Sequence, residues 1–175
     1  MHNASLNNTL NRSVCLTQIK KLIIDKSHLY CDQIIEILNL VSNCNTLILH
    51  TILFDKRDSM SLKQNENSQL ISNTNNMKNI TIKHKCSLRK VKLLINLCSQ
   101  LEHLTMEISY QSLISTVRFL LRKKKNINTI RPLFSLYFLK IGIIGTEQLK
   151  TLIESEKLLD DYKIKRIHDN CYLWW

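Results

Sequence analysis

Glycine and proline are scarce in this chain, with two glycines and one proline among 175 residues. A dinucleotide-binding fingerprint or a phosphate loop needs two or three glycines at fixed spacing, because the backbone must approach the phosphate closely. Gly142 and Gly145 precede Lys150 and Thr151, but Leu149 stands where a phosphate loop requires glycine. The scarcity of both residue types also argues against a turn-rich sandwich or barrel. Common nucleotide-binding folds are therefore disfavoured.

Targeting signals, long apolar runs and closely paired cysteines are also lacking. The first 13 residues are polar and rich in asparagine, without the apolar core of a secretory signal. The longest stretch free of Lys, Arg, Asp and Glu, Ile37–Phe54, contains several polar side chains that hydrocarbon would not tolerate. The six cysteines form no C-x-x-C pair and are interpreted as reduced thiols. We therefore expect an intracellular protein, in the cytoplasm or nucleus, with no membrane association.

Leucine and isoleucine are abundant, at 29 and 22 residues, and they recur with a fixed spacing. Five segments share four mostly apolar positions, separated by two residues, two residues and one residue. The last two positions alternate with a period of two, as a short strand with one buried face requires. The five segments are Leu16, Ile19, Leu22 and Ile24; Val41, Cys44, Leu47 and Leu49; Thr74, Met77, Ile80 and Ile82; Cys98, Leu101, Leu104 and Met106; and Ile130, Leu133, Leu136 and Phe138.

Helical patterns lie between these predicted strands. Apolar residues recur at helical spacing over four ranges, Cys31–Leu40, Leu88–Leu97, Ser112–Leu121 and Thr146–Leu159. The interval 57–76 is polar and carries no such pattern, so we interpret it as an exposed or poorly ordered insertion.

A short strand followed by a helix, repeated at roughly 20 to 30 residues, is the pattern of leucine-rich repeats. We predict an α/β fold in which about five repeats, over residues 16–161, stack as a short leucine-rich-repeat solenoid. Parallel strands would line the concave face and helices the convex face. The repeats are degenerate, because the positions that hold Asn or Cys in the consensus hold Ser27, Ile52, Lys85, Ser109 and Ile141. An ordinary α/β layer domain with strands at the same places is the alternative.

The two ends of the chain do not follow the repeat. Residues 1–15 form a polar N-terminal segment. Residues 162–175 predict two short strands around His168, Asp169 and Asn170. End units of a solenoid must cover the open end of the core, which suits the large apolar side chains among the last four residues. We therefore predict a C-terminal cap over residues 162–175, with Tyr172 and Trp174 among its apolar residues.

The strand Leu133–Phe138, the helix Leu152–Leu159 and the closing Tyr-Leu-Trp-Trp resemble the C-terminal half of an F-box and leucine-rich-repeat protein. In that family an F-box docks a cullin ubiquitin ligase, and the repeat arc recruits the substrate. The resemblance implies a protein-binding scaffold similar to the substrate-recognition half of a ubiquitin-ligase adaptor. No F-box precedes Leu16, so ligase components are expected as partners only if a longer parent chain carries one.

Residues that flank the buried strand positions would face the concave side of the stack. They combine polar, charged and apolar side chains, as an adaptable protein-binding surface does. Tyr137 is the best candidate for a binding hot spot, and the protein partner is unknown. A solvated sheet face without a partner is the alternative interpretation. The candidate binding residues are Lys21, Ile23, Asp25, Thr46, Ile48, His50, Asn79, Thr81, Lys83, His103, Thr105, Glu107, Ser135, Tyr137 and Leu139.

A basic cluster and a net charge of +11 support a second interpretation, a basic nucleic-acid-binding module. At the end of a helix, such side chains also offset the dipole of the terminal carbonyls, which is the simpler interpretation. Only one aromatic residue, Phe119, interleaves the cluster, so nucleic acid is the disfavoured partner. The cluster consists of Arg118, Arg122, Lys123, Lys124 and Lys125.

No residue pattern predicts catalysis, a metal or a cofactor. His28 with Cys31 and His168 with Cys171 share the spacing H-x-x-C and could together supply four zinc ligands. In a solenoid the two pairs would lie at opposite ends, whereas a compact α/β domain would allow them to meet. No nucleophile elbow or catalytic triad motif is present. We therefore expect a protein that is not an enzyme and has neither a cofactor nor a metal.

Overall fold

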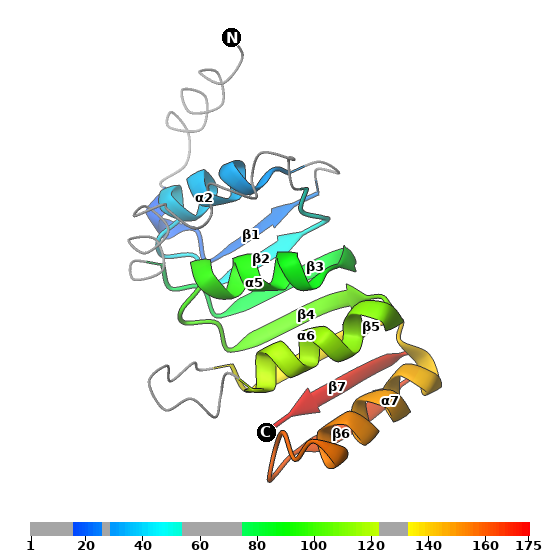
Figure 1. Cartoon of the computed structure of the whole chain (residues 1–175). Coiled ribbons are helices and arrows are strands. Elements are labelled where there is room, and N and C mark those ends of the chain that lie inside the picture. Colours follow the sequence, from blue (N-terminus) through cyan, green and yellow to red (C-terminus); the bar gives the residue numbers. More distant parts are fainter. Residues whose placement is uncertain (1–15, 26–28, 54–74, 123–132) are drawn as a thin grey trace.

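The computed structural model of the chain describes residues 16–25, 29–53, 75–122 and 133–175. In these residues seven strands form one sheet with the order β1-β2-β3-β4-β5-β7-β6 (Figure 1). The described part of the chain is therefore α/β with a mostly parallel sheet, as predicted. The N-terminal segment 1–15 and most of the predicted insertion lie outside the described residues. The first five strands, parallel neighbours in chain order, are β1 (Lys21–Ile24), β2 (Thr46–Leu49), β3 (Asn79–Cys86), β4 (His103–Ile108) and β5 (Ser135–Leu139).

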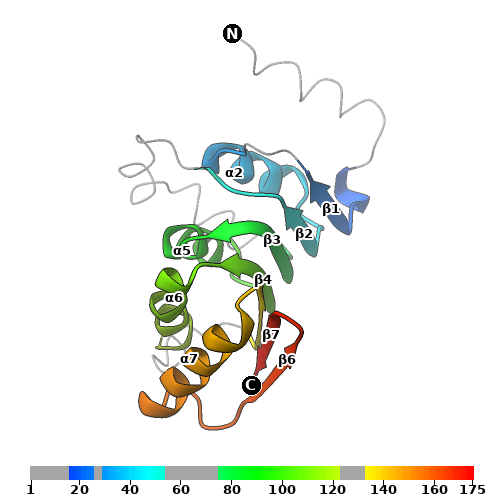
Figure 2. The same ribbon diagram turned by 90° about the vertical axis from the view of Figure 1, so that its right-hand side faces the viewer.

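The four α-helices of the described residues pack on one side of this sheet (Figure 2). A short 3-10 helix, η1 (Leu16–Gln18), precedes β1. The bounds of α2 and α5 agree with the predicted ranges, and α6 extends its predicted range at both ends. The helices are α2 (Cys31–Leu40), α5 (Leu88–Leu97), α6 (Tyr110–Arg122) and α7 (Gly142–Ser155).

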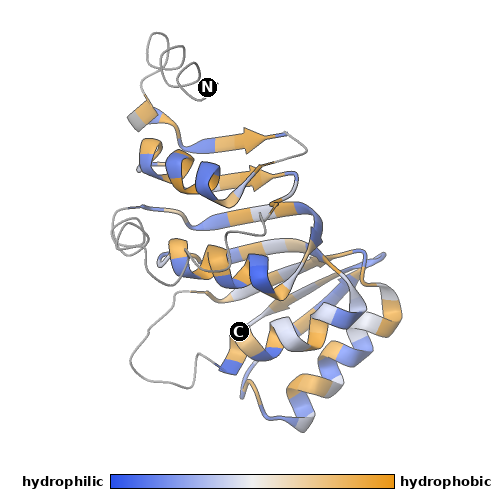
Figure 3. Cartoon of the chain, turned by 45° about the horizontal axis from the view of Figure 1, so that its top comes forward, coloured by the Kyte–Doolittle hydropathy of each residue, from blue (hydrophilic) through white to orange (hydrophobic). Residues whose placement is uncertain are grey.

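The strand register aligns the sequence repeat from strand to strand. The third positions of the five segments are Cα partners of one another, and so are the fourth positions. From β2 to β5 the side chains of both rows are at most 1% exposed, whereas Leu22 and Ile24 on the edge strand β1 are half-buried. Hydrophobic residues alternate with more polar ones along β3 and β4, whereas β1 and β2 are mostly hydrophobic (Figure 3). The core is a continuous apolar layer between the sheet and the helices.

A repeated pair of backbone hydrogen bonds fixes this register. The carbonyl of Lys20, the residue before β1, accepts hydrogen bonds from the amides of Asn45 at 3.0 Å and Thr46 at 3.2 Å. The carbonyls of Asn45, Lys78 and Glu102, each directly before a strand, do the same for the next strand at 2.8–3.3 Å. One geometry therefore joins all five parallel strands.

The C-terminal residues form a hairpin that extends the sheet. Strand β7 (Asn170–Trp174) runs antiparallel to β5, and β6 (Lys163–Ile167) pairs with β7 at the outer edge. The two predicted strands are thus present. Of the apolar residues at the end of the predicted cap, Tyr172 and Trp174 do not cover the core, because strand alternation turns both toward the side without α-helices, whereas Trp175 packs against the core. Leu173, between Tyr172 and Trp174, is fully buried.

The last helix begins and ends four residues earlier than the predicted range Thr146–Leu159, since α7 is Gly142–Ser155. It ends in a Schellman motif, in which Lys157 has a φ of +48° and the amide of Leu158 donates to the carbonyl of Ile153 at 3.0 Å. Leu158 is buried after the helix has ended. The apolar periodicity therefore continues past the end of the helix, which explains the wrong boundary.

Asn75, within the interval predicted as an insertion, is buried and links two segments of the chain. Its Nδ2 donates to the carbonyl of Leu97, the last residue of α5, at 2.6 Å, and its Oδ1 accepts from the amide of Met77 at 3.2 Å. The side chain thereby satisfies a carbonyl that the end of a helix leaves unpaired.

We predict that Asn75→Ala lowers the free energy of unfolding by about 1–3 kcal/mol, because it leaves a buried carbonyl and a buried amide without partners. Urea unfolding of the variant and of wild type measures the difference. Asn76→Ala is the matched control, since the neighbouring side chain is exposed. Equal losses in the two variants would contradict the assigned role.

Candidate partner-binding face

The fifteen predicted binding residues lie on one side of the sheet, opposite the helices, and we call this side the open face. One row of Cα partners across β1 to β5 is Ile23, Ile48, Thr81, Thr105 and Tyr137; another is Lys21, Thr46, Asn79, His103 and Ser135. The remaining five follow at the carboxyl ends of the same strands. All of them are half-buried or exposed, in contrast to the buried rows facing the helices. No helix of the described residues covers this side (Figure 2).

The hairpin adds four residues to the open face that the sequence interpretation missed. Tyr172 and Trp174 on β7 are the Cα partners of Tyr137 and Ser135 on β5. Lys163 and Lys165 on β6 are in turn the partners of Trp174 and Tyr172. The available signal was the alternation of Tyr172 and Trp174 with Cys171 and Leu173, which marks one exposed and one buried side.

Aromatic rings contact one another where the hairpin joins β5. The rings of Tyr137 and Tyr172 are stacked, with centroids 3.7 Å apart and planes inclined by 14°. Hydrogen bonding with Tyr172, together with burial, raises the pKa of Tyr137 above its ordinary value. Beside this pair, the ring of Phe134 packs edge-on against His103 with centroids 4.6 Å apart. The result is a cluster of rings on a rigid sheet, which suits binding with little loss of side-chain freedom.

His103 and Ser135 form the one arrangement on the open face that resembles catalytic chemistry. The Nδ1 atom of His103 lies 2.6 Å from the Oγ atom of Ser135, which is hydrogen-bond distance. A nucleophilic serine also needs a group that orients the histidine and donors for an oxyanion. In the described residues, the second ring nitrogen of His103 has no such hydrogen-bond partner. The pair therefore fixes two side chains on the surface without completing a catalytic site.

Two ion pairs cross the open face. Lys83 Nζ lies 3.4 Å from the carboxylate of Asp25, and Lys140 Nζ lies 3.0 Å from that of Glu107. Three of these four side chains are about half exposed or more, so the pairs contribute little to stability. Between Asp25 and Lys83 lies His50, whose ring packs against that of His84 with centroids 4.3 Å apart. Both carboxylates of the open face are thus balanced by lysines.

The two described arginines of the basic cluster both pair with one glutamate. Glu156 accepts hydrogen bonds from Arg118 Nε at 2.6 Å and from Arg122 at 2.8 Å. The bond from Arg118, reinforced by that from Arg122, holds the pKa of Glu156 below its ordinary value of 4.5. These two arginines join α6 to the end of α7, so they do not form an unpaired cationic patch. Lys123, Lys124 and Lys125 lie outside the described residues.

The cysteines do not assemble a reactive or metal-binding group in the part of the chain that the structure describes. Cys31 lies at the start of α2 and Cys171 in β7, separated by most of the sheet (Figure 1), and His28 lies outside the described residues. Among the described residues, no three His, Cys, Asp or Glu side chains gather as metal ligands would. Burial raises the pKa of Cys86 and of Cys98 to about 12, so both thiols are protonated and weakly nucleophilic.

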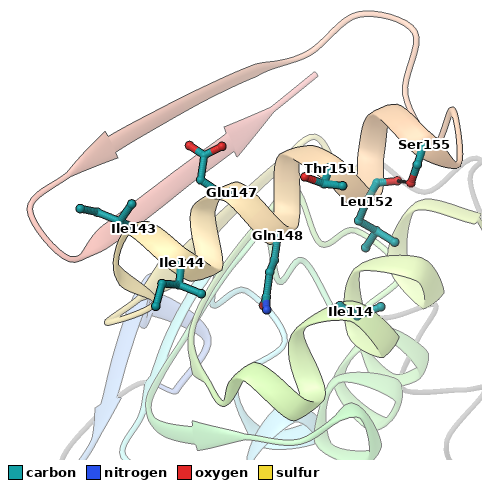
Figure 4. Close-up of a pocket in the computed structure, with 8 residues that line it drawn as sticks. All are labelled: Ile114, Ile143, Ile144, Glu147, Gln148, Thr151, Leu152 and Ser155. Carbon is teal, nitrogen blue, oxygen red and sulfur yellow. Dashed lines mark hydrogen bonds between the residues drawn. The ribbon is translucent and has the colours of Figure 1, made fainter.

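On the helix side, α6 and α7 border an apolar groove of about 530 Å³ (Figure 4). Ile143 and Ile144 lie along it with 60% and 68% of their surfaces exposed, and Ile114 and Leu152 also line it. Glu147 is the one ionisable residue of the lining. The groove therefore offers a mainly apolar surface.

Comparisons with other proteins add no assignment, since no family model, no curated protein and no solved structure matches the chain. Within the described residues, no helix combines the length and the apolar character needed to span a membrane.

We predict that Glu156→Gln lowers the melting temperature at neutral pH and that this difference from wild type shrinks in acid. Because the pKa of Glu156 is lower in the folded protein than in the unfolded chain, its ion pairs stabilise the fold above about pH 4.5. That stability is lost as the pH falls through the lowered pKa. Thermal unfolding at stepwise lower pH measures the effect.

Glu147→Gln is the matched control, because Glu147 lies on α7, the helix that ends directly before Glu156, and has no ion pair in the described residues. Its melting temperature should follow that of wild type. A difference between Glu156→Gln and wild type that stays constant from neutral to acid pH would contradict the assignment.

Proposed function

We propose that the chain is a short arc of degenerate leucine-rich repeats that binds a protein partner on its open face. The regular arrangement of strands, helices and backbone hydrogen bonds along the chain supports a repeat arc. Five parallel strands follow in chain order, the α-helices lie on one side, and the carbonyl before each of the first four strands accepts the same two amides of the next segment. In an arc of this kind each unit contacts mainly its neighbours, and the open face gathers one short row of side chains per unit.

The composition of the open face favours a protein partner. Ile23 is 55% exposed and Trp174 37%, and both stand among polar side chains. Exposed aromatic and aliphatic residues within a polar surround are typical of protein interfaces, where a few of them supply most of the affinity. The single observation that carries the proposal is the stacked pair Tyr137 and Tyr172, where the hairpin joins β5 on this surface.

By the family resemblance, the partner would be a protein recruited for ubiquitin ligation when an F-box is joined to the repeats. The proposed binding on the open face does not depend on a role in ubiquitin ligation. Binding of a protein partner is proposed for the chain itself, and the chain acts as a scaffold with no reaction of its own.

Nucleic acid is the second candidate, and its support is the net charge of +11. Two observations weaken it. Arg118 and Arg122 are engaged by Glu156, and the rings of Tyr137 and Tyr172 each cover one face of the other, which leaves fewer free faces for bases to stack upon.

We predict that Tyr137→Ala weakens the binding of the protein partner about 30-fold or more, because truncation removes an aromatic anchor and its stacked contact. The measurement is affinity capture from cell extract with wild type and variants, followed by quantitative mass spectrometry and a Kd for the captured protein. Circular dichroism shows whether the variant is folded.

Ile144→Ala is the matched control, since it removes a more exposed apolar side chain on the helix side. It should leave capture unchanged. A protein lost with Ile144→Ala and retained with Tyr137→Ala would contradict the open face as the binding surface. Binding of arbitrary RNA that falls steeply between roughly 50 and 200 mM salt would favour the second candidate instead.

A further inference from the structure

The C-terminal hairpin gives the open face a margin of lysines beside aromatic rings. Lys163 and Lys165 are exposed on β6, next to Trp174 and Tyr172 on β7. One residue stands between the two lysines along the strand, so their side chains leave the same side of the sheet about 7 Å apart. Arg166, on the same strand, points to the opposite side and borders a groove with α7.

Among the described residues, the lysines of this margin have no acidic partner. Both carboxylates on the open face, Asp25 and Glu107, are already held by other lysines. Lys21, Lys163 and Lys165 make no ion pair among the described residues. The open face therefore carries unbalanced positive charge, and two of its three unpaired lysines flank the aromatic cluster.

We propose that the segment bound at this end of the open face is an extended acidic stretch of the partner protein. Its carboxylates stand at alternate positions, i and i+2, and an aromatic or aliphatic side chain lies on the same side of the segment. This inference rests on the proposed function, because it uses the same face, and it adds the chemistry of the partner.

The spacing of the lysines is the reason for an extended segment. Side chains at i and i+2 of an extended chain are also about 7 Å apart, so two carboxylates can reach Lys163 and Lys165 together. The apolar side chain would cover the exposed surface of Trp174 and Tyr172. Opposite charges at the rim would speed association and select for acidic partners, while the rings supply the affinity.

The test uses fluorescein-labelled peptides and the full chain. The acidic probe is Gly-Glu-Ser-Glu-Ser-Phe-Ser, which presents two glutamates and the phenylalanine on one side when extended. The neutral probe has glutamine for both glutamates. Fluorescence anisotropy is expected to show tighter binding of the acidic probe to wild type, with a difference that shrinks as salt is added.

The double variant Lys163→Glu and Lys165→Glu should weaken binding of the acidic probe about three- to tenfold. It should also bind a probe with lysine for both glutamates better than wild type does. Arg166→Glu is the matched control, because it makes the same kind of charge change on the other side of β6, and it should leave the Kd unchanged.

Equal binding of the acidic and neutral probes by wild type would overturn the proposal, and so would an equal loss of binding with Arg166→Glu. Oligouridylate that binds more tightly than the acidic probe and competes with it would overturn it in favour of nucleic acid. If the acidic probe fails while Tyr137→Ala still abolishes capture of the partner, the open face remains a protein-binding site with a different chemistry. If Tyr137→Ala has no effect either, the proposed function itself is wrong.

Discussion

The backbone carbonyl that precedes each of the first four strands makes the interaction on which the rest of the sheet depends. By accepting two amides of the next segment, the carbonyls of Lys20, Asn45, Lys78 and Glu102 set the start of every following strand. A slip by one residue would exchange the two sides of a strand and expose its apolar row. The same bonds therefore determine which side chains enter the core and which ones form the open face.

Sequence periodicity was sufficient for most of the fold, because each segment changes from a helical to a strand-like spacing at a defined place. Cys31–Leu40 and Leu88–Leu97 became helices with the expected bounds. The pattern failed at the last helix, where Leu158 packs into the core from the turn after Lys157. The spacing of apolar residues indicates which residues are buried. At this helix, Leu158 is buried although the helical backbone ends at Ser155.

The candidate site was predictable in its five parallel strands and not in the hairpin. A large aromatic residue near the end of a chain is readily interpreted as a cover for the core, and Tyr172 and Trp174 were placed there. The alternation of side chains along β7, and not their size, decides which of them are buried, so the smaller Cys171 and Leu173 face the core. Contacts such as Lys83 with Asp25, 58 residues apart in the chain, depend on side-chain conformations that no periodicity contains.

The reversal of direction between β5 and β7 ends the parallel part of the sheet. A further strand–helix unit needs a parallel neighbour that presents the carbonyl before its strand, and β7 runs the other way beside β5. The outer strand β6 carries exposed lysine side chains and pairs antiparallel with β7, so it does not continue the parallel strand pairing. The parallel register therefore stops at β5, and the hairpin closes this side of the sheet with antiparallel pairs.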